Sequence, residues 1–275
     1  MKRILKKNKD LQIGLSIITI LLLICIVSFF WTPYDPYETS SNILDQLQGP
    51  SKAHLFGTDH LGRDILSRIM IASQKAFFIG ITTLLVAGSL GTLIGLVSGY
   101  VGGIIDNILM RIVDVFMTIP GTVLLLLFVT IFGRGTKQTV IAISIMNFTT
   151  FAKMTRSQVL YLKKQEHILW AKAVGVKETR IIFRHILPDL VPTLLVVSAM
   201  KFSSSVMAEA GLSYLGLGIQ PPEPSWGNML TRAQSSIISS PFTAVIPGLM
   251  ITLFVIGFNL LSDGLRKALK VREAS

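Results

Sequence analysis

The sequence predicts an all-α integral membrane protein with six transmembrane helices and both termini in the cytoplasm. Three observations support this fold class. Only 15% of the 275 residues are charged, whereas soluble domains carry about 25%. Uncharged runs long enough to cross a bilayer recur along the chain. The basic residues gather in the segments that six spans would place on one side of the membrane.

Each span is predicted from an uncharged run, because a helix needs about 20 apolar residues to cross the hydrocarbon core. Phe29, Phe30 and Trp31 close the first run instead of the small residues of a cleavage site, so it is interpreted as a retained anchor. Residues 1–75 would hold this anchor and an extracytoplasmic segment, and residues 263–275 a basic cytoplasmic tail. Within and between them, the predicted spans cover about residues 11–31, 76–101, 115–133, 138–152, 190–217 and 241–262.

The distribution of Lys and Arg sets the orientation of these spans. Six spans place 18 of the 26 basic residues on one face and 7 on the other, with Lys201 inside a span. The excess of basic residues marks the cytoplasmic face. The net charge of +11 therefore needs no nucleic-acid partner, and the chain is expected to be a multi-pass protein of the cell membrane.

The chain shows no pattern of a catalytic, metal or nucleotide site. The one cysteine, Cys25, lies in an apolar run, and the four histidines lack the spacing of metal ligands. Neither a G-x-S-x-G motif nor a G-x-x-x-x-G-K-[ST] phosphate loop occurs in the sequence. We expect no bound cofactor, so any ATP that drives this protein must bind to another chain.

A stripe of glycines runs along the second predicted span. Gly91, Gly95, Gly99 and Gly103 recur every four residues, so a helix would carry them on nearly one face. Such a stripe lets another helix approach closely. It predicts helix packing within the chain, a subunit interface or a mobile helix near a gate.

Lys201 and Glu209 are ionisable residues inside the fifth predicted span. Such residues usually face a bundle interior or an aqueous path. They stand a little over two helical turns apart, hence roughly on one side of the helix. They are therefore candidates for a translocation path or gate, or for structural pairing with other helices.

The long cytoplasmic loop predicts two short helices joined at Gly175. Residues 163–174 and 177–187 each carry an apolar face, and Pro188 is expected to end the second helix. The first face holds Ile168, Leu169, Ala171 and Val174, and the second Ile181, Ile182, His185 and Ile186. This pattern fits a solvated basic loop at the membrane surface or a docking surface for a cytosolic partner.

Several segments resemble the permeases of ABC importers. Gly175 and Leu187–Pro188 resemble the cytoplasmic loop signature by which these permeases contact their ATPase, with Ala171 in the preceding triplet and His185 in place of an isoleucine. Three further segments resemble the peptide and nickel subfamily and its C-type permease in the same order along the chain. They are FGTDHLGRDILSRI (56–69), GYVGGIIDNILMRIVDVFMTIP (99–120) and EAGLSYLGLGIQPPEPSWGNML (209–230).

The resemblance implies the type I ABC importer permease fold and a role in import of oligopeptides or peptide-like metal chelates. It also implies a B-type permease as heterodimer partner, one or two cytosolic ATPases that hold ATP and Mg, an extracytoplasmic solute-binding protein and membrane lipid. The ATPase-coupling loop would then include Glu166, Ala171, Gly175, Ile181, Ile182, His185, Leu187 and Pro188.

Two other classes of protein remain as alternatives. An ion-coupled secondary transporter or channel is expected to have inverted repeats and a fuller set of intramembrane ionisable residues. A non-transporting membrane assembly or receptor protein would usually add a soluble sensing domain. The sequence shows two such ionisable residues, no convincing repeat and no soluble domain.

Overall fold

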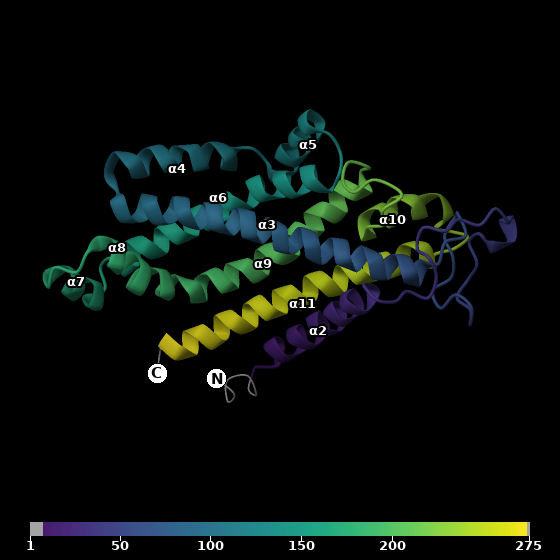
Figure 1. The fold of residues 1–275 in the computed structure, drawn as a ribbon, viewed down its shortest axis with the longest axis horizontal. Helices are drawn as coiled ribbons and strands as arrows, with labels where there is room; N and C mark the ends of the chain where they lie inside the picture. The colour runs from purple at the N-terminus through teal and green to yellow at the C-terminus, as the bar shows by residue number, and fades with distance from the viewer. Residues whose placement is uncertain (1–7, 274–275) are drawn as a thin grey trace.

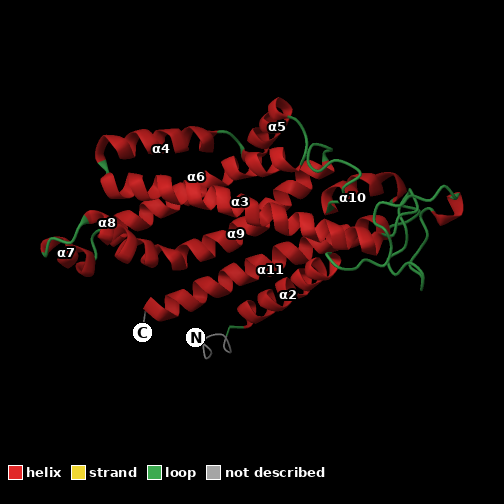
Figure 2. Cartoon of the chain, in the orientation of Figure 1, coloured by secondary structure: helices red, strands yellow, loops and turns green. Residues whose placement is uncertain are grey.

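The computed structural model describes residues 8–273, with side chains described as far as Leu269. The described chain is helical and its connections are loops (Figures 1 and 2). Within residues 8–273 the only β pairing is one isolated bridge, between Thr58 and Asp64. The basic residues predicted at the extreme N-terminus and the last two residues of the predicted tail lie outside the described residues.

Within residues 8–273, seven helices build the bundle and three shorter ones lie at its ends. The seven are α2 (Lys9–Ser28), α3 (Ile65–Val101), α4 (Gly103–Thr118), α5 (Gly121–Phe132), α6 (Thr136–Leu162), α9 (Leu187–Tyr214) and α11 (Phe242–Glu273). The shorter ones are α7 (Glu166–Ala173), α8 (Glu178–Ile181) and α10 (Trp226–Ala233).

Three helices, α3, α6 and α11, extend well beyond their predicted spans, and polar partners stabilise the extended ends of α3 and α6. α3 begins at Ile65 instead of residue 76, since Asp64 caps it by accepting a hydrogen bond from the Ser67 backbone at 2.7 Å. α6 continues past residue 152 to Leu162, and its added turns contain Arg156, which is paired with Asp106. Charge therefore did not mark the end of either helix.

The single straight helix predicted for residues 115–133 does not form. α4 and α5 meet at Pro120 with a bend of 90°. Proline lacks a backbone N–H and forces the preceding residue into an extended conformation, and Ile119 has ψ 125°. The sequence-based interpretation treated this run only by its hydropathy and missed the break.

Four helical segments within residues 8–273 are long and apolar enough to cross a membrane. They are α2, α3, α11 and a continuous helical segment over Glu178–Tyr214 that contains α9. The bent pair of α4 and α5 makes a fifth if it counts as one span. α6 contains the fourth predicted span, residues 138–152. It does not meet this criterion of length and apolar composition, because it is too polar.

Most of the helices run lengthwise through the molecule, and different segments gather at its two ends (Figure 1). The first and last described residues, with α7 and α8, lie toward one end, and the loops of residues 29–64 with α10 lie at the other (Figure 1). α2 packs closely on α11 through glycines of both helices. A Cβ on Gly14 would lie 2.7 Å from the Leu261 nitrogen, and one on Gly264 only 2.6 Å from the Leu11 Cβ. The N-terminal anchor is therefore an integral part of the bundle.

An aromatic cluster holds α3, α9, α10 and α11 together. Phe202 stacks on Phe258 with ring centroids 4.3 Å apart, and Phe254 contacts Phe77, Phe202 and Trp226 at 5.3–5.7 Å. Trp226 and Phe254 are buried. Offset and edge-on aromatic pairs add stability beyond their buried area, so this cluster fixes the half of the bundle that is remote from α7 and α8.

Candidate functional site

The two short helices α7 and α8 form a knob, residues 163–186, that projects from one end of the bundle (Figure 1). Gly175 ends α7 with φ 79°, in the left-handed region that favours glycine. The Gly175 and Val176 amides donate to the carbonyls of Lys172 and Ala171, which closes the turn. The glycine predicted from sequence to separate two helices does so here.

One apolar face of the knob is buried against the bundle. Ile168, Ile181 and Ile186 have no exposed surface and Ala171 is almost fully buried. They pack with Tyr100, Val159, Leu162 and Leu190, which belong to α3, α6 and α9. Close-packed interiors transmit displacement with little compression. A movement of the knob would therefore be passed to three long helices.

A second apolar face of the knob is exposed, and it contains only part of the apolar set predicted from sequence, namely Leu169 and Val174. Trp170, Val174 and Phe183 are 71%, 74% and 69% exposed, and Leu169 is also exposed. The predicted ridge included Ile181, which is buried. Periodicity identified apolar positions on these helices, but which of them faces the bundle depends on how the knob docks. Trp170 and Phe183 were not predicted as surface residues, although an aromatic side chain among lysines and arginines is a usable signal.

Pro188 does not end the second helix of the knob. The chain passes from α8 through a wider π-helical turn, residues 182–186, directly into α9, and Pro188 lies in the first turn of α9. Proline removes one backbone N–H donor, and here it follows a short π-helical turn, the form in which π-helix mostly occurs within α-helices, without ending the helical segment. Of the other predicted loop residues, Glu166 is exposed in the first turn of α7, and Ile182, His185 and Leu187 are half-buried.

An ion pair fastens the turn between α3 and α4 to α6, next to the knob. The Arg156 guanidinium donates two hydrogen bonds of 2.6 Å to the two oxygens of Asp106, and Ser98 donates a third. Lys163 donates at 2.7 Å to the carbonyl of Tyr100, at the C-terminal end of α3. Bidentate Arg–carboxylate pairs are strong and directional, and a cation at a helix C-terminus is favourable. These contacts, called the brace below, hold α3, α4 and α6 together next to the knob.

We expect Asp106→Asn to weaken this brace. Loss of the carboxylate leaves Arg156 without its charged partner, at a cost of about 1–3 kcal/mol in the free energy of unfolding, because Arg156 is partly exposed and water screens it. The melting temperature of the solubilised protein should fall. Asp114→Asn is the matched control, since Asp114 pairs with Lys153 at 2.7 Å with both side chains about half exposed. Equal destabilisation by the two variants would contradict this role for Asp106.

Three of the four glycines in the predicted stripe lie against α6. A Cβ added to Gly91, Gly95 or Gly99 would lie 2.4, 2.3 or 2.9 Å from its nearest atom in α6. Gly103 differs from the prediction. It has φ 60° and open space around it, and it follows Gly102 in the turn between α3 and α4. The four-residue spacing of the glycines continues to Gly103, but α3 ends at Val101. Gly103 therefore does not lie on the same helix face as the other three.

Lys201 and Glu209 lie on the same helix but in separate environments. Lys201 lines a cavity of about 440 Å³ between α6, α9 and α11. Glu209 is buried, accepts a hydrogen bond of 2.6 Å from Ser213, and is not among the residues that line that cavity. Ser213 also accepts from the Ile219 amide. In the structure, Glu209 contributes to packing near the C-terminal end of α9.

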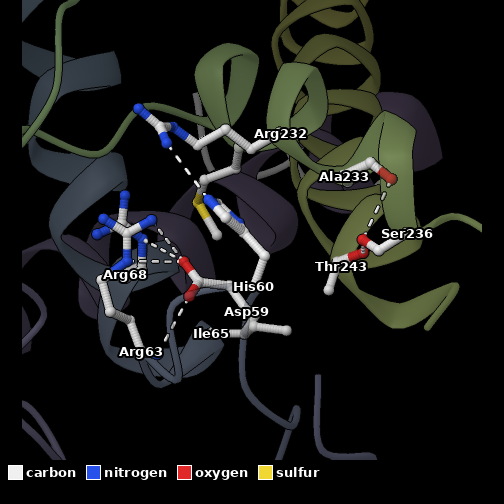
Figure 3. A pocket seen from close by; sticks show the side chains of 10 residues that line it. Asp59, His60, Arg63, Ile65, Arg68, Arg232, Ala233, Ser236 and Thr243 are labelled. Atoms are coloured by element: carbon white, nitrogen blue, oxygen red, sulfur yellow. Dashed lines mark hydrogen bonds and ion pairs between the residues drawn. The ribbon is translucent and has the colours of Figure 1, made fainter. Parts of the chain in front are cut away.

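A cluster of charged residues at the opposite end connects residues 29–64, the outer segment of the predicted topology, to α10 (Figure 3). Asp59 accepts from Arg63 at 2.8 Å and lies 3.6 Å from Arg68, and the Arg232 guanidinium of α10 lies 3.3 Å from His60 Nε2. The cavity between these side chains measures about 10 Å³, which is room for a single water. Four residues of the motif at 56–69 thus have a structural role in this cluster, namely Asp59, His60, Arg63 and Arg68.

The charges of this cluster shift two pKa values outside the spans. Burial alone would raise the pKa of Asp59, but the hydrogen bond and charge of Arg63, with two backbone amides, outweigh it and lower that pKa below its ordinary value. Burial lowers the pKa of His60 below 6.5. The charge of Asp59 opposes this shift, and those of Arg63, Arg232 and Arg68 add to it. His60 is therefore neutral at pH 7 and accepts a hydrogen bond from Arg232.

Acid is expected to weaken the attachment of the outer segment through His60. Below pH 6.5 the unfolded chain binds a proton at His60 that the folded chain does not bind, so stability is lost as the pH falls from 6.5 through the lower folded pKa. The melting temperature should therefore drop more between pH 7.5 and 5.5 for the wild type than for His60→Gln, which still accepts from Arg232. Equal drops in the two proteins would refute this prediction.

Comparison with known proteins adds the family. The family described as binding-protein-dependent transport system inner membrane component matches residues 91–273, which include α4 to α11 and the knob. This chain belongs to that family. The N-terminal transmembrane domain of oligopeptide transport permease C matches residues 1–50. The permease is thus a membrane component of an ABC importer, as the sequence motifs predicted.

Relatives of the permease cover nearly its whole length. It is 41% identical over 271 residues to the dipeptide transport system permease protein of Alkalihalophilus pseudofirmus, covering 98% of this chain and 88% of the relative. It is 42% identical, with the same coverage, to a glutathione transport system permease protein of Pectobacterium atrosepticum. An Escherichia coli glutathione transport system permease protein is 38% identical over 269 residues, 96% of this chain and 87% of that one.

The fold also matches a solved structure. The methionine ABC transporter MetNI, in inward-facing conformations, aligns with a TM-score of 0.52 over 71% of the permease and 96% of that chain, at 17% identity. This similarity establishes the type I importer permease fold. The permease is therefore a multi-pass membrane transport subunit and not an enzyme, with ATP hydrolysed on separate subunits.

Proposed function

We propose that this permease is one half of the translocation path of an importer for short peptides, of the size of dipeptides or glutathione. The sequence relationship to dipeptide and glutathione permeases supports this cargo. Peptide-like metal chelates, the second cargo class that the sequence motifs implied, stay an alternative that none of these relatives' names supports. A second, B-type permease would complete the path as the other half of a heterodimer.

We further propose six membrane crossings with both termini in the cytoplasm. The crossings would be α2, α3, the bent pair of α4 and α5, α6, α9 and α11. The polar turns at the end of α6 would leave the bilayer there, because Lys153 and Arg156 are charged. The first and last described residues lie toward the same end of the molecule as α7 and α8, which supports this orientation (Figure 1), as does the excess of basic residues predicted on that side.

The exposed apolar face of the knob is the single observation that carries the coupling mechanism. Trp170 and Phe183 are large, exposed aromatic side chains on a helical knob whose other face is packed into the bundle. Exposed aromatic residues of this kind are typical anchors of protein interfaces. The knob would insert into an ATPase subunit, which alone would hold ATP and Mg, while this chain would bind neither cofactor.

ATP binding would then move the knob as a rigid body. When two ATPases close, they would draw together the knobs of the two permeases. The buried side of each knob would pass this movement to α3, α6 and α9, and the path would change from inward- to outward-facing. A solute-binding protein docked on the outer loops would then release the peptide into the path.

Uptake measured in proteoliposomes tests this function. The permease, its partner permease, the ATPases and the binding protein should take up radiolabelled dipeptide only when ATP is enclosed with the ATPases. An ion-coupled transporter, the main alternative, would instead take up peptide without ATP when a proton or sodium gradient is imposed. ATP-independent uptake of that kind would overturn the proposal.

A further inference from the structure

The cavity between α6, α9 and α11 has the dimensions of a ligand site. Its volume of about 440 Å³ falls in the usual range of about 300–1,000 Å³ for small-molecule pockets. α6 contributes Thr150, Met154 and Gln158, which are four residues apart and therefore share one face of that helix. The lining thus combines hydrogen-bonding groups with flexible apolar side chains.

The charge of this cavity is entirely positive. Lys201 and Arg266 line it, and no Asp or Glu is among its described lining residues. The Arg266 guanidinium lies 3.3 Å from the sulfur of Met200, the residue beside Lys201, so both cations lie at the same part of the lining. The Lys201 ammonium has no hydrogen-bond or ion-pair partner in the part of the chain that the structure describes. An unpaired charge within a span is costly, and an anionic ligand would offset that cost.

Lys201 lies near the middle of α9. From Leu187, the start of α9, to Lys201 the helix rises about 21 Å at 1.5 Å per residue, which is the middle of this 28-residue helix. Since Arg266 of α11 contacts Met200, the cavity lies beside the middle of α9.

We propose that this cavity holds the carboxylate of the transported peptide, with Lys201 as its principal charged contact and Arg266 as the second. The inference rests on the proposed function, because it assigns the cavity to the path of that same importer. Two cations without a neighbouring acid attract a carboxylate and repel a free metal cation. The apolar lining, which includes Val196 and Val197, can accept the peptide's side chains.

Protection of a cysteine in the cavity tests the proposal in the complete importer. The native Cys25 is replaced by alanine, and Gln158→Cys introduces a thiol into the cavity. Alanyl-alanine should slow labelling of this thiol by a membrane-impermeant maleimide from the cytoplasmic side, whereas alanyl-alanine amide should not. Tyr161→Cys is the control, because Tyr161 is exposed on α6 and does not line the cavity, so its labelling should not respond to peptide.

Charge variants of Lys201 complete the test. Lys201→Gln should raise the alanyl-alanine concentration for half-protection about tenfold to a hundredfold, the usual value of a charge-assisted hydrogen bond, and Lys201→Arg should restore most of it. Equal protection by acid and amide, or no effect of Lys201→Gln, would overturn the proposal. Protection by phosphatidylglycerol vesicles and not by peptide would overturn it in favour of a lipid headgroup. Failure of the proposed function is distinguishable, because it removes ATP-driven dipeptide uptake by the wild type.

Discussion

Replacing Gly95 by leucine is expected to prevent assembly of the helix bundle. A Cβ at this position would lie 2.3 Å from the Ala152 carbonyl oxygen and 2.7 Å from the Thr155 Cβ. The first of these is a backbone atom of α6 and cannot rotate away, so α3 and α6 would have to separate. Forced overpacking of this kind costs about 3 kcal/mol or more in the free energy of unfolding. The yield of folded, monodisperse protein after solubilisation measures the effect.

A pair of alanine variants provides the matched control for this prediction. Gly88 lies on the same helix, but a Cβ there would meet only the Phe151 ring at 3.9 Å, an ordinary contact. Gly88→Ala should therefore be neutral or stabilising, because alanine is favoured over glycine in a helix by about 1 kcal/mol. Gly95→Ala should lower the melting temperature. If Gly95→Ala were as stable as Gly88→Ala, the close approach of α3 and α6 at Gly95 would be wrong.

Placing a carboxylate on the exposed face of the knob is expected to uncouple transport from ATP hydrolysis. Trp170→Glu and Phe183→Glu leave the buried face of the knob intact, so the protein should fold and insert normally. Truncation of a central aromatic anchor in an interface typically costs 2 kcal/mol or more, about thirtyfold in affinity. ATP-driven dipeptide uptake should fall by at least about tenfold, and copurification of the ATPases with the permease should decrease.

Two further variants separate docking from folding. Tyr161→Glu adds the same charge at an exposed aromatic residue outside the knob and should not change uptake. Ile181→Glu places the charge at a fully buried position, so it should reduce folding and yield instead of coupling alone. Normal folding with lost uptake for Ile181→Glu would show that the buried and exposed faces of the knob have been assigned the wrong way round.

The structure gives physical reasons for the motifs that carried the resemblance. In the segment 56–69, Asp59, Arg63 and Arg68 form the charged cluster that holds the outer loops (Figure 3). In the segment 99–120, Asp106 is the carboxylate of the brace beside the knob, and Pro120 makes the bend. Neither role was predicted from sequence. The partner of Asp106 is Arg156, 50 residues further along the chain, and the effect of Pro120 is lost when hydropathy is averaged over a whole span.

The position of Arg266 beside the cavity could not be predicted from sequence either. The sequence predicts a basic cytoplasmic tail from residue 263, and in the structure residues 263–273 are the continuation of α11. Only the packing of α11 beside α9 brings the Arg266 guanidinium to Met200 and into the cavity that Lys201 lines. Lys201 itself could be identified from sequence, because a lysine inside an apolar run is conspicuous by composition.

The sequence by itself determined that this protein is a helical membrane permease, because hydropathy and short motifs are local properties and can be read without a fold. It also located Gly91, Gly95 and Gly99 and the turn at Gly175, since residue spacing and backbone freedom are encoded locally. The tertiary structure alone decided which face of the knob is exposed, that Gly103 leaves the stripe, that Pro188 is accommodated within a continuous helical segment, and that Lys201 and Glu209 are separated. These properties depend on which surfaces of sequence-distant helices pack against each other. The burial of a side chain is set by that packing and cannot be read from a single segment.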